Sequence, residues 1–192
     1  CKRLNFQGRV KPGGLVVFAR QGLNIRQVPL KSKARLAFWE QGRLMHVAVP
    51  IDNDKHVLHI TLVYGHPNAS TNAEQKDNNE PLLKESLAIM AELGGAPVLF
   101  CGDLNVRLEA SPVLLEATRF QKVVDLANFH PSGEPQPTCF QQTGSKGTRI
   151  DHLLANSTGS ALARSVRKVE DCGIPAHMPL LCDLDIAQAC QK

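Results

Sequence analysis

The chain has 192 residues, of which 43% are hydrophobic and 21% are charged, an ordinary composition for a globular protein. This length allows one domain with a substantial core and is too short for two domains of the usual size. Lys and Arg outnumber Asp and Glu by 22 to 18, and the net charge of +4 permits a polyanionic partner without indicating one, because a strong electrostatic footprint would cluster basic residues.

The cysteines and the apolar runs restrict the expected compartment. The six cysteines form no Cys-x-x-Cys pair and no zinc-type spacing, so we expect reduced thiols in an intracellular protein, with the nucleus among its compartments. No signal-peptide pattern is present, and no apolar run approaches the roughly 20 residues of a membrane helix. Because the sequence begins at Cys1 and soon enters a strand pattern, we expect residues 1–192 to be a single domain taken from a longer chain.

The first fifty residues read as strands on short connections. Gly13–Arg20, entered through a glycine pair, and Ile25–Leu30 are two predicted strands, with Gly22 at the bend between them. Arg35–Trp39 and Arg43–Val49 are predicted as two more. Such short connections favour antiparallel pairing.

His56–Tyr64 is predicted to be an interior strand. Val57, His59, Thr61 and Val63 alternate with Leu58, Ile60, Leu62 and Tyr64, so both faces are mostly apolar. A strand of this kind is covered on both sides.

A helix follows the loop of residues 65–70. Leucines and other apolar residues recur every three to four positions from Asn72, and Gly94 with Gly95 ends the helix. Pro81 is expected near its first turn. Ser111 and Pro112 predict a second, short helix through Thr118, with the serine as its N-terminal cap.

The stretch Val98-Leu-Phe-Cys-Gly-Asp-Leu-Asn105 lies at the centre of the pattern. Residues 96–101 have the length and apolarity of a buried strand, so Asp103 and Asn105 stand at its carboxyl end. Two residues apart on extended backbone, their side chains would project to the same side and suit a metal or a phosphate. An Asp/Asn-rich turn that merely closes the strand is the alternative.

The rest of the chain adds strands around a long polar segment. Residues 128–147 form a predicted surface loop, which either contacts a substrate or only connects. Arg149–Ala155, Arg164–Val169 and His177–Ile186 are predicted strands. About ten strands with few helices favour an α+β fold in which two mostly antiparallel sheets stack face to face with helices outside.

Polar residues recur at the ends of these strands, where sheet-built enzymes usually place their sites. Each also has a structural explanation. Tyr64 could anchor its strand end, Asp151 could pair with Arg149, and His177 could be a satisfied histidine beside a proline turn. The set consists of Tyr64 with Asn68, Asp103 with Asn105, Asp151, and His177.

Taken together, these segments resemble the endonuclease/exonuclease/phosphatase superfamily of metal-dependent phosphodiesterases. Within it the chain looks most like the apurinic-type endonuclease domains of non-LTR retrotransposons. The resemblance implies a four-layer α/β/β/α sandwich whose first strand is missing here. It is carried by Gly14–Arg20, Leu62–Asn68, Leu99–Asn105, Thr138–Phe140, Thr148–Leu154 and Ala176–Leu180.

The resemblance also implies roles. His177 would polarise the attacking water with Asp151 holding the imidazole, and Asp103 would orient that water or help to hold a divalent ion. Mg²⁺ or Mn²⁺ is the implied cofactor, with Asp103 and Asn105 as its ligands, because the donors are oxygen atoms. Asn105 and Tyr64 would donate to phosphate oxygens, and the path of the phosphate would be lined by Asn68, Thr138 and Arg149.

Two departures from the family pattern concern metal binding. The family's metal-binding glutamate has no counterpart among the first thirteen residues, which contain no acidic residue, and its closing Ser-Asp-His motif reads Pro175-Ala176-His177. Hard cations need anionic oxygen, so metal affinity should be lower. Three hypotheses follow: a Mg²⁺-dependent DNA endonuclease, a non-catalytic module that binds nucleic acid or a partner, and a phosphatase acting on a small phosphoester. Composition does not choose among them, and it leaves the oligomeric state open.

Overall fold

The structure is a computed structural model, and it describes residues 2–3, 14–51, 56–130, 136–140, 146–170, 173–174 and 176–189. None of the helices within these ranges is long and apolar enough to cross a membrane. Parts of the predicted loop at residues 128–147 lie outside the described residues.

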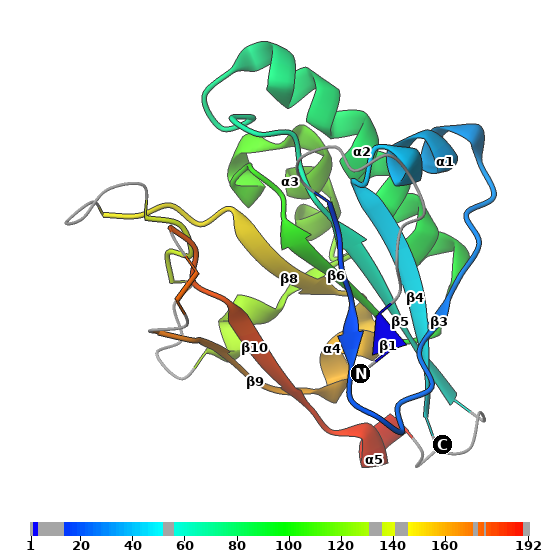
Figure 1. Ribbon diagram of the computed structural model, residues 1–192. Helices are drawn as coiled ribbons and strands as arrows, with labels where there is room; N and C mark the ends of the chain where they lie inside the picture. The colour runs from blue at the N-terminus through cyan, green and yellow to red at the C-terminus, as the bar shows by residue number, and fades with distance from the viewer. Residues whose placement is uncertain are drawn as a thin grey trace.

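A six-stranded mixed sheet forms the centre of the molecule, with strand order β3-β4-β5-β6-β8-β7 (Figure 1). Only β5 and β6 run parallel, and the other neighbouring pairs are antiparallel. The predicted interior strand is confirmed, because β5 lies between β4 and β6. The strands are β3 (Arg26–Gln27), β4 (Leu44–Ile51), β5 (His56–Val63), β6 (Val98–Asp103), β7 (Val124–Asp125) and β8 (Asp151–Ala155).

Two antiparallel pairs complete the strands of the described residues. β9 (Ala163–Lys168) pairs with β10 (Leu180–Leu184), and β1 (Lys2–Arg3) pairs with β2 (Phe18–Ala19). The predicted strands over Gly13–Arg20 and Ile25–Leu30 are therefore reduced to two residues each, in β2 and β3. The predicted class is confirmed: an α+β fold with stacked sheets flanked by helices.

The helices begin at capped positions. The long helix α2 starts after Asn72, whose side chain accepts from the Gln75 amide, and α3 starts after Ser111, which accepts from the Leu114 amide as predicted. Pro81 lies inside α2 and not near its first turn, on the exposed side of the helix. The elements are α1 (Lys33–Glu40), α2 (Ala73–Glu92), α3 (Pro112–Arg119), α4 (Ser157–Leu162), α5 (Ile186–Ala189) and the 3₁₀ turns η1 (Leu108–Ala110) and η2 (Leu126–Phe129).

Helix α1 corrects one prediction, because Arg35–Trp39 was expected to be a strand. Ser32 caps the helix by accepting from the Arg35 amide at 3.1 Å. The Arg35 guanidinium then pairs with Glu85 at 2.8 Å and with both oxygens of Glu92 at 2.8 and 2.6 Å on α2. These tertiary ion pairs, together with the cap, outweigh a weak strand pattern.

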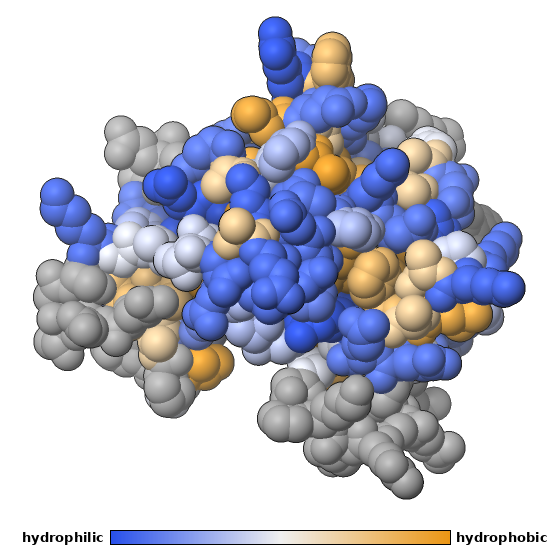
Figure 2. Space-filling model, turned by 90° about the horizontal axis from the view of Figure 1, so that it is seen from above, coloured by the Kyte–Doolittle hydropathy of each residue, from blue (hydrophilic) through white to orange (hydrophobic). Residues whose placement is uncertain are grey.

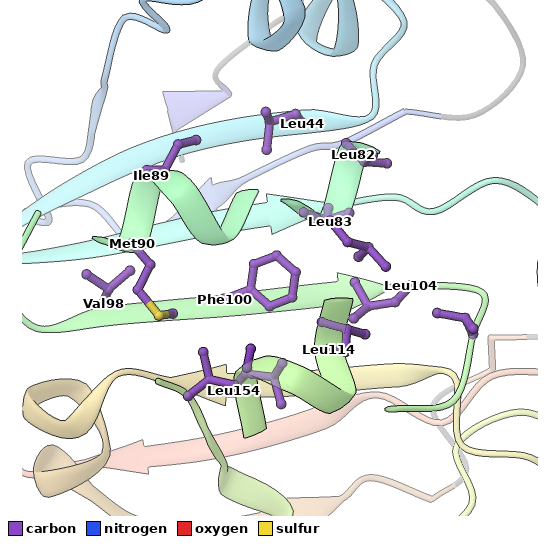
Figure 3. Packing of buried hydrophobic residues seen from close by; sticks show 14 residues of the cluster. Leu44, Leu82, Leu83, Ile89, Met90, Val98, Phe100, Leu104, Leu114 and Leu154 are labelled. Carbon is purple, nitrogen blue, oxygen red and sulfur yellow. The ribbon is translucent and has the colours of Figure 1, made fainter. Parts of the chain in front are cut away.

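One hydrophobic core lies between the helices and the central sheet. The Phe100 ring, fully buried, points from β6 toward α2 and α3, where Leu83, Leu104 and Leu114 surround it (Figure 3). Alternation along β6 places Val98 and Phe100 on this helix side. Seen from above, hydrophilic side chains cover the middle of the outer surface and hydrophobic ones lie in smaller groups around them (Figure 2).

A second core lies on the opposite face of the central sheet, against β9 and β10. Leu99 of β6 and Leu153 and Ala155 of β8 pack there with Val166 of β9. The core to which a strand residue belongs shows toward which face of the central sheet its side chain points. Every second residue of β6 and β8 therefore points toward the β9–β10 pair.

Candidate active site

Two carboxylates face each other where β6 and β8 pair. Asp103 and Asp151 are direct partners in the antiparallel register. Asp103 lies four residues after Leu99 and Asp151 two residues before Leu153, so both belong to the face that packs on β9 and β10. Directly opposed side chains in a ladder lie about 5 Å apart at Cβ. The fold therefore brings two like charges close together.

A short ladder outside the named strands delivers His177 to this pair. Cys139 forms isolated bridges with both Thr148 and His177. The Met178 amide donates to the Thr138 carbonyl at 2.7 Å, which continues the ladder past the histidine. As a result the Nδ1 atom of His177 lies 3.0 and 3.2 Å from the two carboxylate oxygens of Asp151.

The three side chains form one group that could hold a cation. One ligand atom from each of Asp103, Asp151 and His177 lies within 4.8 Å of the other two. Burial, and then the charge of Asp151, raise the pKa of Asp103 from 3.8 to about 6, and the hydrogen bond from the Asn105 amide opposes them. A divalent cation would relieve this repulsion, so the donor set fits a metal that prefers oxygen and imidazole.

Asn105 stands in a turn beyond the strand. β6 ends at Asp103, and Asn105 has a left-handed backbone (φ 54°), so the strand alternation expected for the two side chains does not extend to it. Its amide donates to the Asp103 carboxylate at 3.0 Å, and its Nδ2 lies 3.3 Å from the Gly65 carbonyl. The Asp/Asn turn considered as an alternative is therefore present, and it also orients Asp103.

Tyr64 and Asn68 lie on the neighbouring strand end rather than in the three-residue group. Tyr64 follows β5, and Asn68 is exposed with φ 64°. Arg43 lies over the Tyr64 ring at 5.5 Å and donates to the Tyr64 and Gly65 carbonyls at 3.2 and 2.8 Å. The side chains of Arg43 and Asn105 therefore donate to the same carbonyl oxygen, that of Gly65. Apart from its place at the start of a predicted strand, no sequence pattern indicated a role for Arg43 at the site.

The side chains of Thr138 and Arg149 form hydrogen bonds with other residues of the protein. Thr138 is fully buried, and its hydroxyl accepts from the Ile150 and Asp151 amides at 3.3 and 3.1 Å, which supports the start of β8. Arg149 donates twice to Asp125, at 2.6 Å each. The alternative that Asp151 is the partner of Arg149 is therefore wrong. Asp125 was not among the predicted site residues.

Cys139 is a further neighbour of His177 that sequence reasoning did not single out. Its sulfur lies 3.9 Å from the Nε2 atom of the histidine, and the side chain is buried. Burial, and then the charges of Asp151 and Asp103, raise the pKa of the thiol. Cys139 is therefore neutral at physiological pH and packs beside the imidazole.

Comparisons with known proteins identify the fold. No protein-family model matches the chain, and no curated protein does. Among solved structures, a 3′-5′ exonuclease from Neisseria meningitidis shares 15% identity over 84% of this chain and 71% of its own (TM-score 0.59). An AP endonuclease from Archaeoglobus fulgidus shares 15% over 76% and 66% (TM-score 0.58). The AP endonuclease LMAP from Leishmania major shares 15% over 84% and 61% (TM-score 0.64).

Proposed function

We propose that this chain, which has the endonuclease/exonuclease/phosphatase fold, hydrolyses phosphodiesters in a metal-dependent reaction, with DNA as the substrate. The observation that carries the proposal is the group formed by His177, Asp151 and Asp103, in which a carboxylate holds the imidazole and a second carboxylate faces it. A histidine–aspartate pair beside an acidic cation site is suited to the hydrolysis of phosphate esters.

The proposed roles follow from the atoms that are engaged. Because Asp151 binds Nδ1 of His177, the Nε2 atom is the one that would take a proton from the attacking water. The Asp151 carboxylate would stabilise the imidazolium that results. Asn105 and Tyr64 are proposed donors to the phosphate oxygens, with Asn68 at the edge of the substrate path.

The metal would be held by Asp103 and Asp151, with the Asn105 side-chain oxygen as a further donor. Mg²⁺ or Mn²⁺ is proposed, because hard cations prefer oxygen ligands. When bound, such an ion would neutralise the negative charge that develops on the phosphoryl oxygens. The protein would keep the two carboxylates facing each other through the β6–β8 register.

DNA is proposed as the partner because of the solved structures that share this fold. Their titles name an exonuclease, AP endonucleases, and a 3′ phosphatase from Neisseria bound to a product DNA hairpin. This chain spans 61 to 71% of the length of those proteins. Its net charge of +4 is compatible with a nucleic-acid partner.

Nicking of supercoiled plasmid tests the proposal. His177→Ala should lower the Mg²⁺-dependent rate by roughly 100-fold or more, as expected for loss of a general base. His56→Ala is the matched control, because His56 opens β5 at the end opposite to Tyr64. Cleavage by His177→Ala at the wild-type rate would contradict the proposal. Turnover of inositol phosphates but not of an abasic duplex would favour a small-phosphoester phosphatase.

A second candidate function, DNA binding without cleavage, is favoured by the small number of carboxylates in the group. Ala176 precedes His177 with φ 63°, a conformation that aspartate adopts more readily than alanine. Ala176→Asp would therefore add a carboxylate beside His177 with little backbone strain. DNA binding by an inactive wild type, together with cleavage by Ala176→Asp, would identify the chain as a binding module.

A further inference from the structure

We propose that Asn79 is a positioning residue, which fixes the loops after β5 and β6 against each other and thereby places Asp103. This inference rests on the proposed function, because it concerns the same site. Asn79 lies on α2, outside the group of side chains that would contact the phosphate.

The Asn79 side chain is fully buried on the apolar face of α2. It follows the spacing of Leu82, Leu83 and Ser86, the other fully buried residues of that face. A carboxamide at such a position is costly unless its atoms are hydrogen-bonded. Both ends are satisfied, because Nδ2 donates to the Leu104 carbonyl at 2.9 Å and Oδ1 accepts from the His66 amide at 3.0 Å.

These two partners belong to the loops that carry the site. Leu104 stands between Asp103 and Asn105, and His66 comes two residues after Tyr64. The Leu104 amide in turn donates to the Ile150 carbonyl at 2.8 Å, next to Asp151. One side chain on α2 therefore connects the ends of β5, β6 and β8 through backbone groups.

The contact between the loops leaves little room for adjustment. A Cβ atom on Gly65 would lie 2.2 Å from the Leu104 carbonyl oxygen and 3.1 Å from the Asn79 Oδ1 atom. The Gly65 amide donates to the Asp103 carbonyl at 2.7 Å. Asn105 nearby holds a left-handed conformation, which persists only where the surroundings determine it.

Replacing Asn79 should therefore displace the Asp103 side chain. In Asn79→Leu the helix face stays apolar and filled, but the Leu104 carbonyl and the His66 amide lose their partner. A displacement of about 1 Å at a reacting group costs on the order of 100-fold in rate. We expect kcat to fall roughly 10- to 100-fold while KM changes little.

Ser86→Ala is the matched control. Ser86 is equally buried on the same face, and its hydroxyl donates to the Leu82 carbonyl of its own helix at 2.7 Å. Ser86→Ala removes a buried hydrogen bond of α2 without touching either loop. A merely structural role for Asn79 would make the two variants alike in kcat.

Amide hydrogen exchange supplies a second measurement that needs neither metal nor turnover. The Asn105 amide donates to the Asp103 carboxylate, so its protection reports where that side chain lies. In Asn79→Leu the His66 and Asn105 amides should exchange faster by on the order of tenfold, whereas Ser86→Ala should leave both unchanged. If Asn79→Leu does not fold, Asn79→Asp keeps the acceptor for His66 and removes the donor to Leu104.

The outcomes separate this inference from the proposed function. A wild type that cleaves no phosphodiester would remove the proposed function, and Asn105 exchange in the variants would still decide the role of Asn79. A folded Asn79→Leu or Asn79→Asp with wild-type exchange at Asn105 would overturn the inference. So would a loss of kcat no larger than that of Ser86→Ala.

Discussion

Asp103→Asn should make the metal-free protein more stable while it removes activity. The pKa of Asp103 is raised to about 6 because the carboxylate is partly buried and faces Asp151. A displacement of about two pKa units corresponds to roughly 3 kcal/mol against the charged form. Partial exposure to solvent reduces this to roughly 1–2 kcal/mol. Asparagine keeps the oxygen that accepts from the Asn105 amide, so the variant should gain that amount at neutral pH.

The raised pKa of Asp103 also determines how the stability difference between Asp103→Asn and wild type changes with pH. Folded Asp103 retains its proton up to about pH 6, whereas the unfolded chain releases it near pH 4. Between these values the folded state binds more protons, so wild-type stability falls as pH rises. The advantage of Asp103→Asn over wild type should therefore be absent near pH 4, grow through pH 6 and stay constant above pH 7. Urea denaturation in EDTA across this range measures it, and the neutral-pH gain corresponds to roughly 2–8 °C in Tm.

Asp125→Asn is the control, because the Asp125 carboxylate accepts two hydrogen bonds from Arg149 and should lose stability on neutralisation. Saturating Mg²⁺ should reverse the ranking at Asp103, since binding at 100 times Kd stabilises wild type by about 2.7 kcal/mol and the variant by much less. An Asp103→Asn protein no more stable than wild type at pH 7 in EDTA would refute the reasoning, and with it the proximity of the two charges.

Two further predictions concern the scaffold. Gly102→Ala should lower the free energy of unfolding by at least about 3 kcal/mol or prevent folding, because the φ of Gly102 is 144° and an added Cβ would lie 1.9 Å from the Val63 carbonyl oxygen. Thermal unfolding of this variant and of Gly94→Ala, at an exposed glycine, measures the loss. Equally small losses of stability in the two variants would contradict the prediction. His46→Leu should flatten the acid limb of the stability curve. Burial, and then the charges of His59 and Arg35, lower the pKa of His46 to about 4. Below pH 6.5 the unfolded chain therefore binds a proton at His46 that the folded chain does not bind, which lowers the free energy of unfolding by up to about 3 kcal/mol near pH 4. Urea midpoints at pH 4 and 7 test it, and parallel curves for variant and wild type would contradict it.

The strands that carry the site were predictable because their signals are local. A run of apolar residues ending in a polar one marks both β5 and β6, and it placed Asp103 at a strand end from sequence alone. The grouping of Asp103 with Asp151 and His177 came from family resemblance, and the structure gives its physical basis in the β6–β8 register and the Cys139 bridges.

The features that sequence missed depend on partners far along the chain. Arg35 is fifty residues from Glu85, and the ion pair between them favours helix α1 over the expected strand. Asn79 lies in a helix whose apolar period was recognised, yet nothing in that period indicates hydrogen bonds to His66 and Leu104. Contacts of this kind exist only once the layers have packed.

The supports of the site act mainly on its geometry and offset only part of its negative charge. Thr138 and Asn79 bind backbone groups beside the carboxylates, and Asn105 donates one amide to Asp103. The cation Arg149, whose side chain belongs to the same stretch as Asp151, is engaged by Asp125 instead. The repulsion between Asp103 and Asp151 therefore remains in the folded protein, where it lowers stability and raises affinity for a cation by the same interaction. Because the same repulsion sets both quantities, a substitution that stabilises the fold by relieving it must also weaken the affinity for a cation.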